Sequence, residues 1–406
     1  MSPSQSYLSK NIPVGMLLPQ EEMLEVITKK EKLFIGIPRE IFFQENRIGL
    51  VPDAVNVLVN NGHRVVVENN AGKMSNFQNS DYSEAGAEIA YSSKEVYKAD
   101  VILKIAPPSL KEIEMMKPGQ ILFSTLQLAV QPENFVRQLL SKRITAIAFD
   151  WIKDKEGIYP IVRAMGEIAG TASILIAAEY LSNENNGAGI LLGSIAGISP
   201  TEVVILGAGT VGEFSARAAL GLGATVKLFD NSLYKLRRIQ TALNRRVFTS
   251  VIHPKVIQKH LKTADVVIGS IRSKQGKAPC IISEEMVKDM KQGSVIIDVS
   301  IDQGGCFETS QVTSHTNPVF RKHGVIHYCV PNIPSRVSRT ASYAFSTVCG
   351  PTLLNIGEYG GVGKILKYDA GLRNGIYIYN GILINKYLGE LFNLPYKDIN
   401  LLTAII

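Results

Sequence analysis

The sequence of 406 residues predicts an α/β protein with two doubly wound lobes, the second of which is inserted into the first. Short β-branched runs alternate with segments of helical spacing, and this alternation is typical of parallel sheets that helices cover on both faces. The alternation breaks at the glycine-rich stretch ENNGAGILLGSIAG and starts again at EVVILGAG. The two series of strands therefore predict two sheets, and a chain of this length is expected to bury more than one core.

The first lobe is predicted to begin near residue 34. Helical spacing in VPDAVNVLVNNG predicts a helix over residues 51–62 that ends at Asn-Gly. Residues 1–33 are interpreted as a leader with a short helix over 19–33. Short apolar runs predict strands over residues 33–38, 64–69, 99–106, 120–127 and 144–150.

The second lobe follows a long helix that is predicted over residues 163–183. The tail, residues 340–406, is predicted to be helical and to return to the first lobe. We therefore expect a substrate domain of residues 34–163 with 340–406, an inserted cofactor domain of residues 164–339, and a functional cleft between them. The strands predicted for the second lobe cover residues 202–209, 225–230, 264–271, 294–302 and 325–330.

Composition favours a soluble, cytoplasmic protein that acts on small molecules. The net charge of +7 comes without a block of five or six like charges, which argues against a nucleic-acid partner. The four cysteines form no CxxC pair, so we expect neither a zinc site nor a disulfide framework. No run of 18 apolar residues predicts a membrane span, and the N-terminal residues do not resemble a secretory signal.

The stretch VILGAGTVG indicates a dinucleotide site of the Rossmann type, because it joins a predicted strand to a predicted helix. Gly207 permits the sharp turn, and Gly209 lets the backbone approach a pyrophosphate. Gly212 lets the helix pack closely on the strand. The helix N-terminus then offers free N–H groups and a partial positive charge to the phosphates. Both lobes are therefore predicted to be Rossmann-like, and the second is the cofactor lobe.

An acidic residue after the next strand favours NAD over NADP. Asp230 ends the strand TVKLFD and can accept hydrogen bonds from both hydroxyls of the adenosine ribose. It would also repel a 2′-phosphate. The nearby cations Lys235, Arg237 and Arg238 keep NADP open as the alternative cofactor.

Several stretches together resemble the alanine dehydrogenase family, which is related to the cofactor-binding first domain of the membrane nicotinamide nucleotide transhydrogenase. The resemblance covers about residues 33–400, and DVSIDQGGCFE is its most specific part. It implies reversible oxidative deamination of L-alanine by NAD, with pyruvate and ammonia as products, in a homo-oligomer that is generally a hexamer. The stretches that carry it are IGIPREIFFQENRIGLVPDAVNVLVNNGHRVVVENNAG, ADVILKIAPP, RAMGEIAG, ADVVIGSI, GKAPCIISEEMVKDMKQGSVIIDVSIDQGGCFE and HYCVPNIPSRVSRTASYA.

The resemblance also implies roles for residues of the substrate site. Arg47 in QENRIGL matches an arginine that holds the substrate carboxylate, and a guanidinium suits a planar, paired contact with that group. Lys104 in VILKIAPP matches the substrate lysine of the family. Asp302 in SIDQGG matches an acid beside the nicotinamide, and it follows a strand at the edge where such sheets bind ligands.

Further positions match the family's cofactor contacts. Lys235 and Ser250 match contacts on the adenosine side. Asn332 is the best polar candidate near the nicotinamide ribose. The remaining matches are Ile271, the loop Val299, Ser300, Ile301 and Asp302, and the loop with Val330 and Ile333.

One departure concerns proton transfer. The family's acid–base histidine follows a strand, and the matching position in ILFSTLQLAV is Gln127. Glutamine cannot exchange a proton near neutral pH. Gly166 likewise replaces a serine of the family. Asp302 or Lys104 is the candidate for the missing proton acceptor, and His327 is a third choice.

The sequence therefore predicts an NAD-dependent alanine dehydrogenase and leaves two alternatives open. One is a related oxidoreductase that acts on another amino or imino acid. The other is a non-enzymatic NAD(H)-binding protein of the transhydrogenase type. Both alternatives follow from Gln127, because the loss of a general base affects the activity more than it affects cofactor binding.

Overall fold

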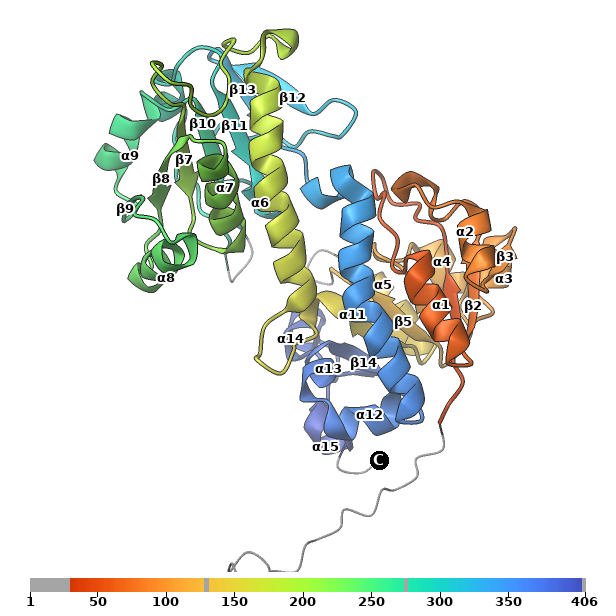
Figure 1. Ribbon diagram of the computed structural model, residues 1–406. Coiled ribbons are helices and arrows are strands. Elements are labelled where there is room, and N and C mark those ends of the chain that lie inside the picture. Colours follow the sequence, from red (N-terminus) through yellow and green to blue (C-terminus); the bar gives the residue numbers. More distant parts are fainter. Residues whose placement is uncertain (1–29, 128–130, 274–276, 404–406) are drawn as a thin grey trace, which may run out of the picture.

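The protein folds into two lobes, each built on one sheet, and helix α6 runs from one lobe to the other (Figure 1). The computed structural model describes residues 30–127, 131–273 and 277–403. Strands from both ends of the chain enter the eight-stranded sheet of the first lobe, whereas the seven-stranded sheet of the second lobe is continuous in sequence. The second lobe is therefore inserted into the first, and the predicted fold class is confirmed.

The first sheet has the strand order β15-β14-β6-β5-β4-β1-β2-β3, in which β1 to β6 are parallel. In β1, Ile35 and Ile37 belong to one core while Phe34 packs against the core on the opposite face. This burial on both faces explains the continuous apolar runs. The strands are β1 (Phe34–Ile37), β2 (Arg64–Glu68), β3 (Glu88–Ala90), β4 (Val101–Leu103), β5 (Ile121–Ser124) and β6 (Thr145–Ala148), and the helices between them are α1 (Pro52–Asn60), α2 (Asn79–Glu84), α3 (Ser93–Val96), α4 (Leu110–Met115) and α5 (Glu133–Ser141).

The prediction of a wholly helical tail is wrong over residues 376–383, where β14 (Ile376–Tyr379) and β15 (Ile382–Leu383) form a hairpin. β14 pairs antiparallel with β6 and so extends the first sheet. Asn380 and Gly381 have φ values of 47° and 77°, as a two-residue hairpin turn with the right twist requires. The rest of the tail is helical, with α11 (Ser338–Glu358), α12 (Val362–Tyr368), α13 (Ala370–Asn374), α14 (Lys386–Phe392) and α15 (Ile399–Thr403).

The second sheet has the order β12-β13-β11-β10-β7-β8-β9, and only its edge strand β12 is antiparallel. Val203 and Ile205 of β7 pack on one face, while Val204 and Leu206 pack on the other. The strands are β7 (Glu202–Leu206), β8 (Thr225–Phe229), β9 (Phe248–Ser250), β10 (Val266–Gly269), β11 (Val295–Asp298), β12 (Val319–Lys322) and β13 (Val325–Tyr328), and the helices are α7 (Thr210–Gly221), α8 (Leu233–Leu243), α9 (Pro254–Leu261) and α10 (Glu284–Lys288).

Besides β14 and β15, the strands that the sequence did not predict are β3, β9 and β12, and each of these three lies at the edge of a sheet. Edge strands bury less side-chain surface, so their apolar pattern is weaker. The predicted leader helix is absent from residues 30–33, and the rest of it lies outside the described residues. Short 3₁₀ helices complete the fold: η2 (Lys73–Ser75), η3 (Phe149–Trp151), η4 (Asn183–Asn185), η5 (Val299–Gln303) and η6 (Ile333–Val337).

Helix α6 (Pro160–Leu181) connects the lobes and confirms the long helix that the sequence predicts. Pro160 opens the helix, where its missing N–H costs nothing. A Cβ on Gly170 would lie 2.4 Å from the carbonyl oxygen of Val211, so glycine is what allows α6 to pack closely on α7. Among the described helices, α6 alone is long and apolar enough to cross a bilayer. Its contacts with α7 and α11 instead make it a core helix of this fold.

Candidate functional site

The predicted cofactor residues lie together along the carboxyl edge of the second sheet. Six strands of this sheet are parallel, so their carboxyl ends form one continuous edge, which is where doubly wound sheets bind ligands. Following the sheet order, this edge carries Val330, Asn332 and Ile333 after β13, Val299, Ser300, Ile301 and Asp302 after β11, Ile271 after β10, Gly207, Gly209 and Gly212 after β7, Asp230 and Lys235 after β8, and Ser250 at the end of β9.

The glycine loop between β7 and α7 has three positions with different steric demands. Gly207 has a φ of 107°, and a Cβ there would lie 2.5 Å from the carbonyl oxygen of Ser270. A Cβ on Gly212 would lie 1.9 Å from the carbonyl oxygen of Gly207. At Gly209, no atom of the described residues other than its chain neighbours lies within 4 Å of the corresponding position. The protein therefore leaves no room for a side chain at Gly207 and Gly212. At Gly209, beside the N-terminus of α7, it leaves space that a ligand can occupy.

Asp230 is buried beside this loop. Its Oδ2 accepts a hydrogen bond from the backbone N–H of Ala208 at 2.8 Å, and its Oδ1 accepts one from Ser232 at 2.7 Å. Lys235 Nζ lies 3.9 Å from Oδ2. Each carboxylate oxygen has a further lone pair, so hydrogen bonds from ribose hydroxyls can be added to the backbone contacts. The aspartate thus holds the loop in shape, and its predicted contact with the ribose hydroxyls stays a prediction.

An ion pair between Glu213 of α7 and Arg238 of α8 contacts the same loop. Glu213 is buried in the first turn of α7, and its Oε2 lies 2.6 Å from Arg238 Nη1. Arg238 Nη2 donates to the carbonyl oxygen of Ala208 at 3.2 Å. Burial alone would raise the pKa of Glu213, but hydrogen bonds from Arg217 and Arg238 hold it below its ordinary value. One of the cations that kept NADP open is therefore engaged inside the protein.

The residues predicted to bind or convert the substrate follow strands of the first sheet. Arg47 lies in the segment after β1, Lys104 directly follows β4, and Gln127 follows β5. These strands are parallel neighbours, so the three residues belong to the carboxyl edge of the first sheet. The structure thus places the two predicted groups of residues on the corresponding edges of the two sheets.

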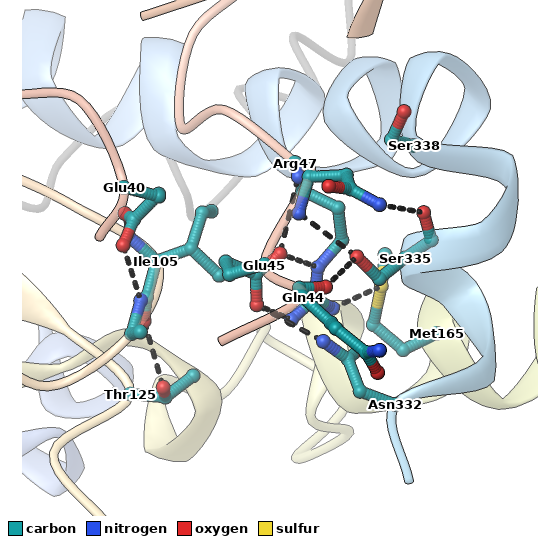
Figure 2. A network of polar contacts seen from close by, with 12 residues as sticks. Glu40, Gln44, Glu45, Arg47, Ile105, Thr125, Met165, Asn332, Ser335 and Ser338 are labelled. Atoms are coloured by element: carbon teal, nitrogen blue, oxygen red, sulfur yellow. Dashed lines mark hydrogen bonds and ion pairs between the residues drawn. The ribbon is translucent and has the colours of Figure 1, made fainter. Parts of the chain in front are cut away.

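Arg47 is buried, and its guanidinium is already paired with the carboxylate of Glu45 (Figure 2). Its Nε donates to Glu45 Oε1 at 2.7 Å, and its Nη2 donates to Glu45 Oε2 at 2.6 Å. Its Nη1 contacts the sulfur of Met165 on α6 at 3.4 Å. A guanidinium paired with a carboxylate at two points has the geometry expected for substrate binding, but here the partner is a neighbouring side chain. Sequence reasoning did not assign a role to Glu45.

Asn332 connects this pair to the second lobe. Its side-chain Nδ2 donates to Glu45 Oε2 at 3.0 Å, and its backbone N–H donates to Asp302 Oδ1 at 3.2 Å. The side chain of Asp302 is exposed on one side, but the protein around its other sides raises its pKa above the ordinary value, against the opposing effects of Asn332 and Arg47. The structure therefore brings Arg47 of the first lobe together with Asn332 and Asp302 of the second.

Lys104 does not reach that cluster through any contact of its side chain. The side chain is fully buried, with Nζ 2.9 Å from Glu112 Oε1 and 3.6 Å from Glu40 Oε2. Burial would raise the pKa of Glu112, but Lys104 and Ser109 hold it below its ordinary value. Burial raises the pKa of Glu40 to about 7 in spite of the lysine. This geometry favours a structural role for Lys104, and its predicted role toward a substrate stays a prediction.

Glu40 also ties together the segments that follow three strands. It accepts hydrogen bonds from the backbone N–H groups of Ile105 and Ala106, and the hydroxyl of Thr125 donates to the carbonyl oxygen of Ile105 at 2.7 Å. Figure 2 shows Glu40, Ile105 and Thr125 beside the Arg47 pair. The buried carboxylate therefore fixes the shape of the substrate edge.

The two positions that depart from the family lie near the predicted site. Gln127 is exposed and has a φ of 44°, an uncommon conformation for a residue other than glycine. Gly166 faces the first turn of α7, where an added Cβ would lie 3.4 Å from Thr210. Neither position carries a group that titrates near neutral pH.

Sequence reasoning gave no role to His315, but the structure brings this histidine to the cluster. Its backbone N–H donates to Gln44 Oε1 at 2.7 Å, and its ring Nε2 is buried with no hydrogen-bond partner among the described residues. Burial lowers the pKa of His315. The positive charges of Arg336 and Arg47 lower it as well, whereas Asn332 and Glu45 act in the opposite direction. Sequence offers no signal for this meeting, because Gln44 and His315 are 271 positions apart.

His327, the third choice for the proton acceptor, is instead a core residue. Its Nε2 lies 2.8 Å from the hydroxyl of Thr309, and its Nδ1 lies 3.1 Å from the carbonyl oxygen of Val325. Burial lowers its pKa to about 4. Both ring nitrogens are engaged within the second lobe, so its position favours a structural role.

Comparisons with known proteins agree with this architecture. The family description "Alanine dehydrogenase/PNT, N-terminal domain" matches residues 36–169, and "Alanine dehydrogenase/PNT, C-terminal domain" matches residues 173–386. An alanine dehydrogenase of Staphylococcus saprophyticus is 39% identical over 368 residues, which are 90% of this chain and 99% of that protein. Alanine dehydrogenase 2 of Staphylococcus aureus is 39% identical over 366 residues, 90% of this chain and 98% of that protein.

Solved structures show the same likeness. A structure of L-alanine dehydrogenase superposes with a TM-score of 0.83 at 36% sequence identity, and the match covers 88% of this chain and 99% of that one. A transhydrogenase from Sinorhizobium meliloti superposes with a TM-score of 0.75 at 21% identity, covering 87% of this chain and 99% of that one. At that identity the second match shows the shared fold alone.

Proposed function

This chain belongs to the alanine dehydrogenase/PNT family, and we propose that it catalyses the NAD-dependent, reversible oxidative deamination of L-alanine to pyruvate and ammonia. The observation that carries the proposal is the cluster of Arg47, Asn332 and Asp302, which joins a carboxylate-binding group of one lobe to an acid at the cofactor edge of the other. We propose domains of residues 34–163 with 340–406 for the substrate and 164–339 for the cofactor.

The glycine loop fits NAD. The open space at Gly209, the N-terminus of α7 and the buried carboxylate of Asp230 would hold the pyrophosphate and the adenosine ribose. Ser250 and Lys235 would face the adenosine side, and the residues after β11 and β13 would face the nicotinamide. When bound, NAD supplies the acceptor for the hydride that leaves the substrate Cα.

Arg47 would bind the substrate when the substrate carboxylate replaces the carboxylate of Glu45 at its guanidinium. Glu45 occupies the guanidinium in the structure, and Asn332 offers Glu45 a separate hydrogen bond that can persist when the substrate takes the guanidinium. Because both partners of Arg47 are carboxylates, the arginine keeps a charged partner throughout. Lys104, held by Glu112 and Glu40, would support this edge from behind.

Proton transfer is proposed to depend on Asp302. Deamination requires water to attack an imine, and a carboxylate beside the reacting carbon can accept the proton of that water. Burial raises the pKa of Asp302 above its ordinary value, a direction that favours proton acceptance by its carboxylate. Gln127 can orient a water molecule by hydrogen bonding but cannot exchange its proton.

The test is NADH formation by the purified protein with a panel of L-amino acids, together with the reverse reaction of pyruvate and ammonia. We expect the highest kcat/KM for L-alanine, and Asp302→Asn should lower kcat by about 10²–10⁴-fold, as the loss of a general base does. NADH formation with another amino acid but not with alanine would instead support a related dehydrogenase. NADH binding without any turnover would favour the transhydrogenase-like, non-enzymatic alternative, which Gln127 supports.

The proposal includes the setting in which the protein works. Its partners would be small molecules, namely an amino acid, a 2-oxo acid and ammonia, with neither nucleic acid nor a membrane involved. We further propose a cytoplasmic homo-oligomer, with a hexamer as the expectation from the family. Light scattering of the purified protein tests the hexamer directly, and a monomer at micromolar concentration would contradict it.

A further inference from the structure

An apolar groove runs between α1 and α11 in the first lobe, where the two helices pack on each other (Figure 1). Its volume is about 340 Å³. Two of its side chains leave much of their surface uncovered, since Val57 is 48% exposed and Tyr343 is 40% exposed. The residues that line the groove include Ala54 and Val57 of α1 and Tyr343, Gly350, Pro351 and Leu354 of α11. A contiguous apolar hollow of this kind is typical of a surface that another element covers.

One end of the groove lies where the described chain begins. The last lining residue of α11 comes one helical turn before Glu358. Lys30 Nζ lies 3.5 Å from Glu358 Oε1, and the backbone N–H of Glu31 donates to the carbonyl oxygen of Gly357 at 2.8 Å. Residues 1–29 therefore join the fold beside this end of the groove.

The sequence ahead of Lys30 has the pattern of an amphipathic helix. Residues 19–29 read PQEEMLEVITK, and the proline at their start suits the first position of a helix. At the helical period of 3.6 residues, the apolar and the charged side chains fall on opposite faces. The apolar face carries Met23, Leu24, Val26 and Ile27, and the charged face carries Glu21, Glu22, Glu25 and Lys29. A helix of this length is marginal in water by itself, so it needs a surface that covers its apolar face.

The length of this segment agrees with the length of the groove. Residues 19–29 span about 16 Å as a helix, and the stretch of α11 from Tyr343 to Leu354 also spans about 16 Å. Because the segment joins the fold at the Leu354 end, it can lie along the groove without a long connection. The family description begins to match only at residue 36, so the segment lies ahead of the domains that the family shares.

We propose that residues 19–29 form a helix whose apolar face docks in the α1–α11 groove of the same chain. The charged face of the helix stays in water. The hydroxyl of Ser342 on α11 accepts a hydrogen bond from the backbone N–H of Ile48, the residue after Arg47, at 2.9 Å. By covering α1 and α11, the docked segment would stabilise the helices that hold this part of the substrate edge. The docking does not depend on which reaction the site catalyses.

Disulfide capture in the full-length protein tests this placement. The exposed free cysteine Cys280 is replaced by serine, and Leu24→Cys is combined with Pro351→Cys, an exposed position of the groove. With oxidised glutathione as the oxidant, we expect an intrachain disulfide between positions 24 and 351, identified by mass spectrometry. The matched control combines Leu24→Cys with Lys255→Cys, an exposed position on α9 of the second lobe. The pair in the groove should oxidise at least about tenfold faster, because docking raises the effective concentration of its two thiols.

Charged substitutions give a second measurement. Leu24→Glu should lower the melting temperature by about 2 °C or more, because it places a charge on the docked face. Leu8→Glu makes the same change ahead of the segment and should leave the melting temperature unchanged. Val57→Glu in the groove should lower it by a similar amount and slow the capture of Leu24→Cys by Pro351→Cys to the control rate. In the double variant the two losses should be less than additive, because both remove the same contact.

Three results would overturn the inference. Equal rates of oxidation in the groove pair and the control pair would place the segment elsewhere. A disulfide between two chains would assign the groove to the segment of a second copy. A loss of oligomer mass in light scattering of Val57→Glu, but not of Leu24→Glu, would make the groove a contact between subunits. Alanine turnover by the unsubstituted protein tests the proposed function separately, so neither outcome decides the other.

Discussion

The carboxyl edges of the two sheets differ in the kind of chemistry that shapes them. The cofactor edge is shaped mainly by backbone groups: three glycines within six residues, a helix N-terminus and an aspartate that accepts hydrogen bonds from two backbone N–H groups. The substrate edge is shaped by ion pairs between side chains, such as Lys104 with Glu112 and Glu40. A backbone site follows from a contiguous motif, whereas a set of charge pairs depends on which partners meet in space.

The steric demand of the glycine loop gives the largest expected effect. In Gly212→Ala, the new Cβ would lie 1.9 Å from a backbone oxygen, so the loop or α7 has to move. We expect NADH binding to be lost and the melting temperature to fall by about 2 °C or more, since packing strain costs about 1–3 kcal/mol. Calorimetry and thermal melting measure the two effects.

Two other glycines sharpen this test. Gly209→Ala meets no protein atom within 4 Å, so it should keep its stability while losing NADH affinity, because the methyl group would occupy the space of the pyrophosphate. Gly221→Ala, at the end of α7, also meets no atom within 4 Å and should change neither property. Full NADH affinity in Gly209→Ala would show that the open space is not the phosphate site.

The buried carboxyl groups of the substrate edge predict a dependence of stability on pH. In the part of the chain that the structure describes, Asp150 Oδ1 is buried and has no hydrogen-bond partner, and burial raises the pKa of Asp150 to about 6. The folded protein then binds more protons than the unfolded chain between about pH 4 and 6, so this group's contribution to stability falls as the pH rises through that window. At neutral pH the cost is at most about 3 kcal/mol.

Asp150→Asn removes that titration. As the pH increases from 4 to 7, the free energy of unfolding of the variant should rise relative to that of the unsubstituted protein, by at most about 3 kcal/mol. Urea unfolding at several pH values measures it, with Glu156→Gln in an exposed turn as the control. An identical pH dependence in both variants would mean that Asp150 is ionised in the folded protein.

Particular residues show how far sequence could predict this molecule. The apolar runs predicted the central strands, because burial on both faces leaves a continuous signal, but the edge strands β3, β9 and β12 lack it. The hairpin at Asn380 and Gly381 was predictable from its turn residues and was missed. The glycine motif located the cofactor edge, whereas the contact of Asn332 with Glu45 and the approach of His315 to Gln44 join positions that are 287 and 271 residues apart and depend on the tertiary fold.

Arg47 tests the substrate edge directly. Arg47→Lys keeps the charge but loses the second N–H contact, so KM for the amino or 2-oxo acid should rise about tenfold while NAD affinity is unchanged. Glu45→Gln should lower KM for the amino or 2-oxo acid, because a neutral amide competes less with the substrate for Arg47 than a carboxylate does. Steady-state kinetics with alanine and pyruvate measure both. Unchanged kcat/KM in Arg47→Lys would remove Arg47 from the site.

The preference for NAD(H) over NADP(H) gives the smallest expected effect. Asp230 holds the glycine loop in shape and is also expected to bind the ribose, so its substitution affects both cofactors. If its carboxylate binds the ribose hydroxyls and repels a 2′-phosphate, NAD(H) should bind at least about tenfold tighter than NADP(H), a difference near 1.4 kcal/mol.

Asp230→Ala also removes the acceptors of the Ala208 and Ser232 N–H groups, so both cofactors should bind more weakly. The affinity for NAD(H) should fall further, because only NAD(H) loses the ribose contact, while NADP(H) is relieved of the charge repulsion and can approach Lys235. The ratio of the two affinities therefore has to shrink even as each of them falls, and fluorescence titration of both reduced cofactors measures that ratio. Equal affinities of the unsubstituted protein for the two cofactors would contradict the role of Asp230, and an unchanged ratio in the variant would assign the aspartate to the shape of the loop alone.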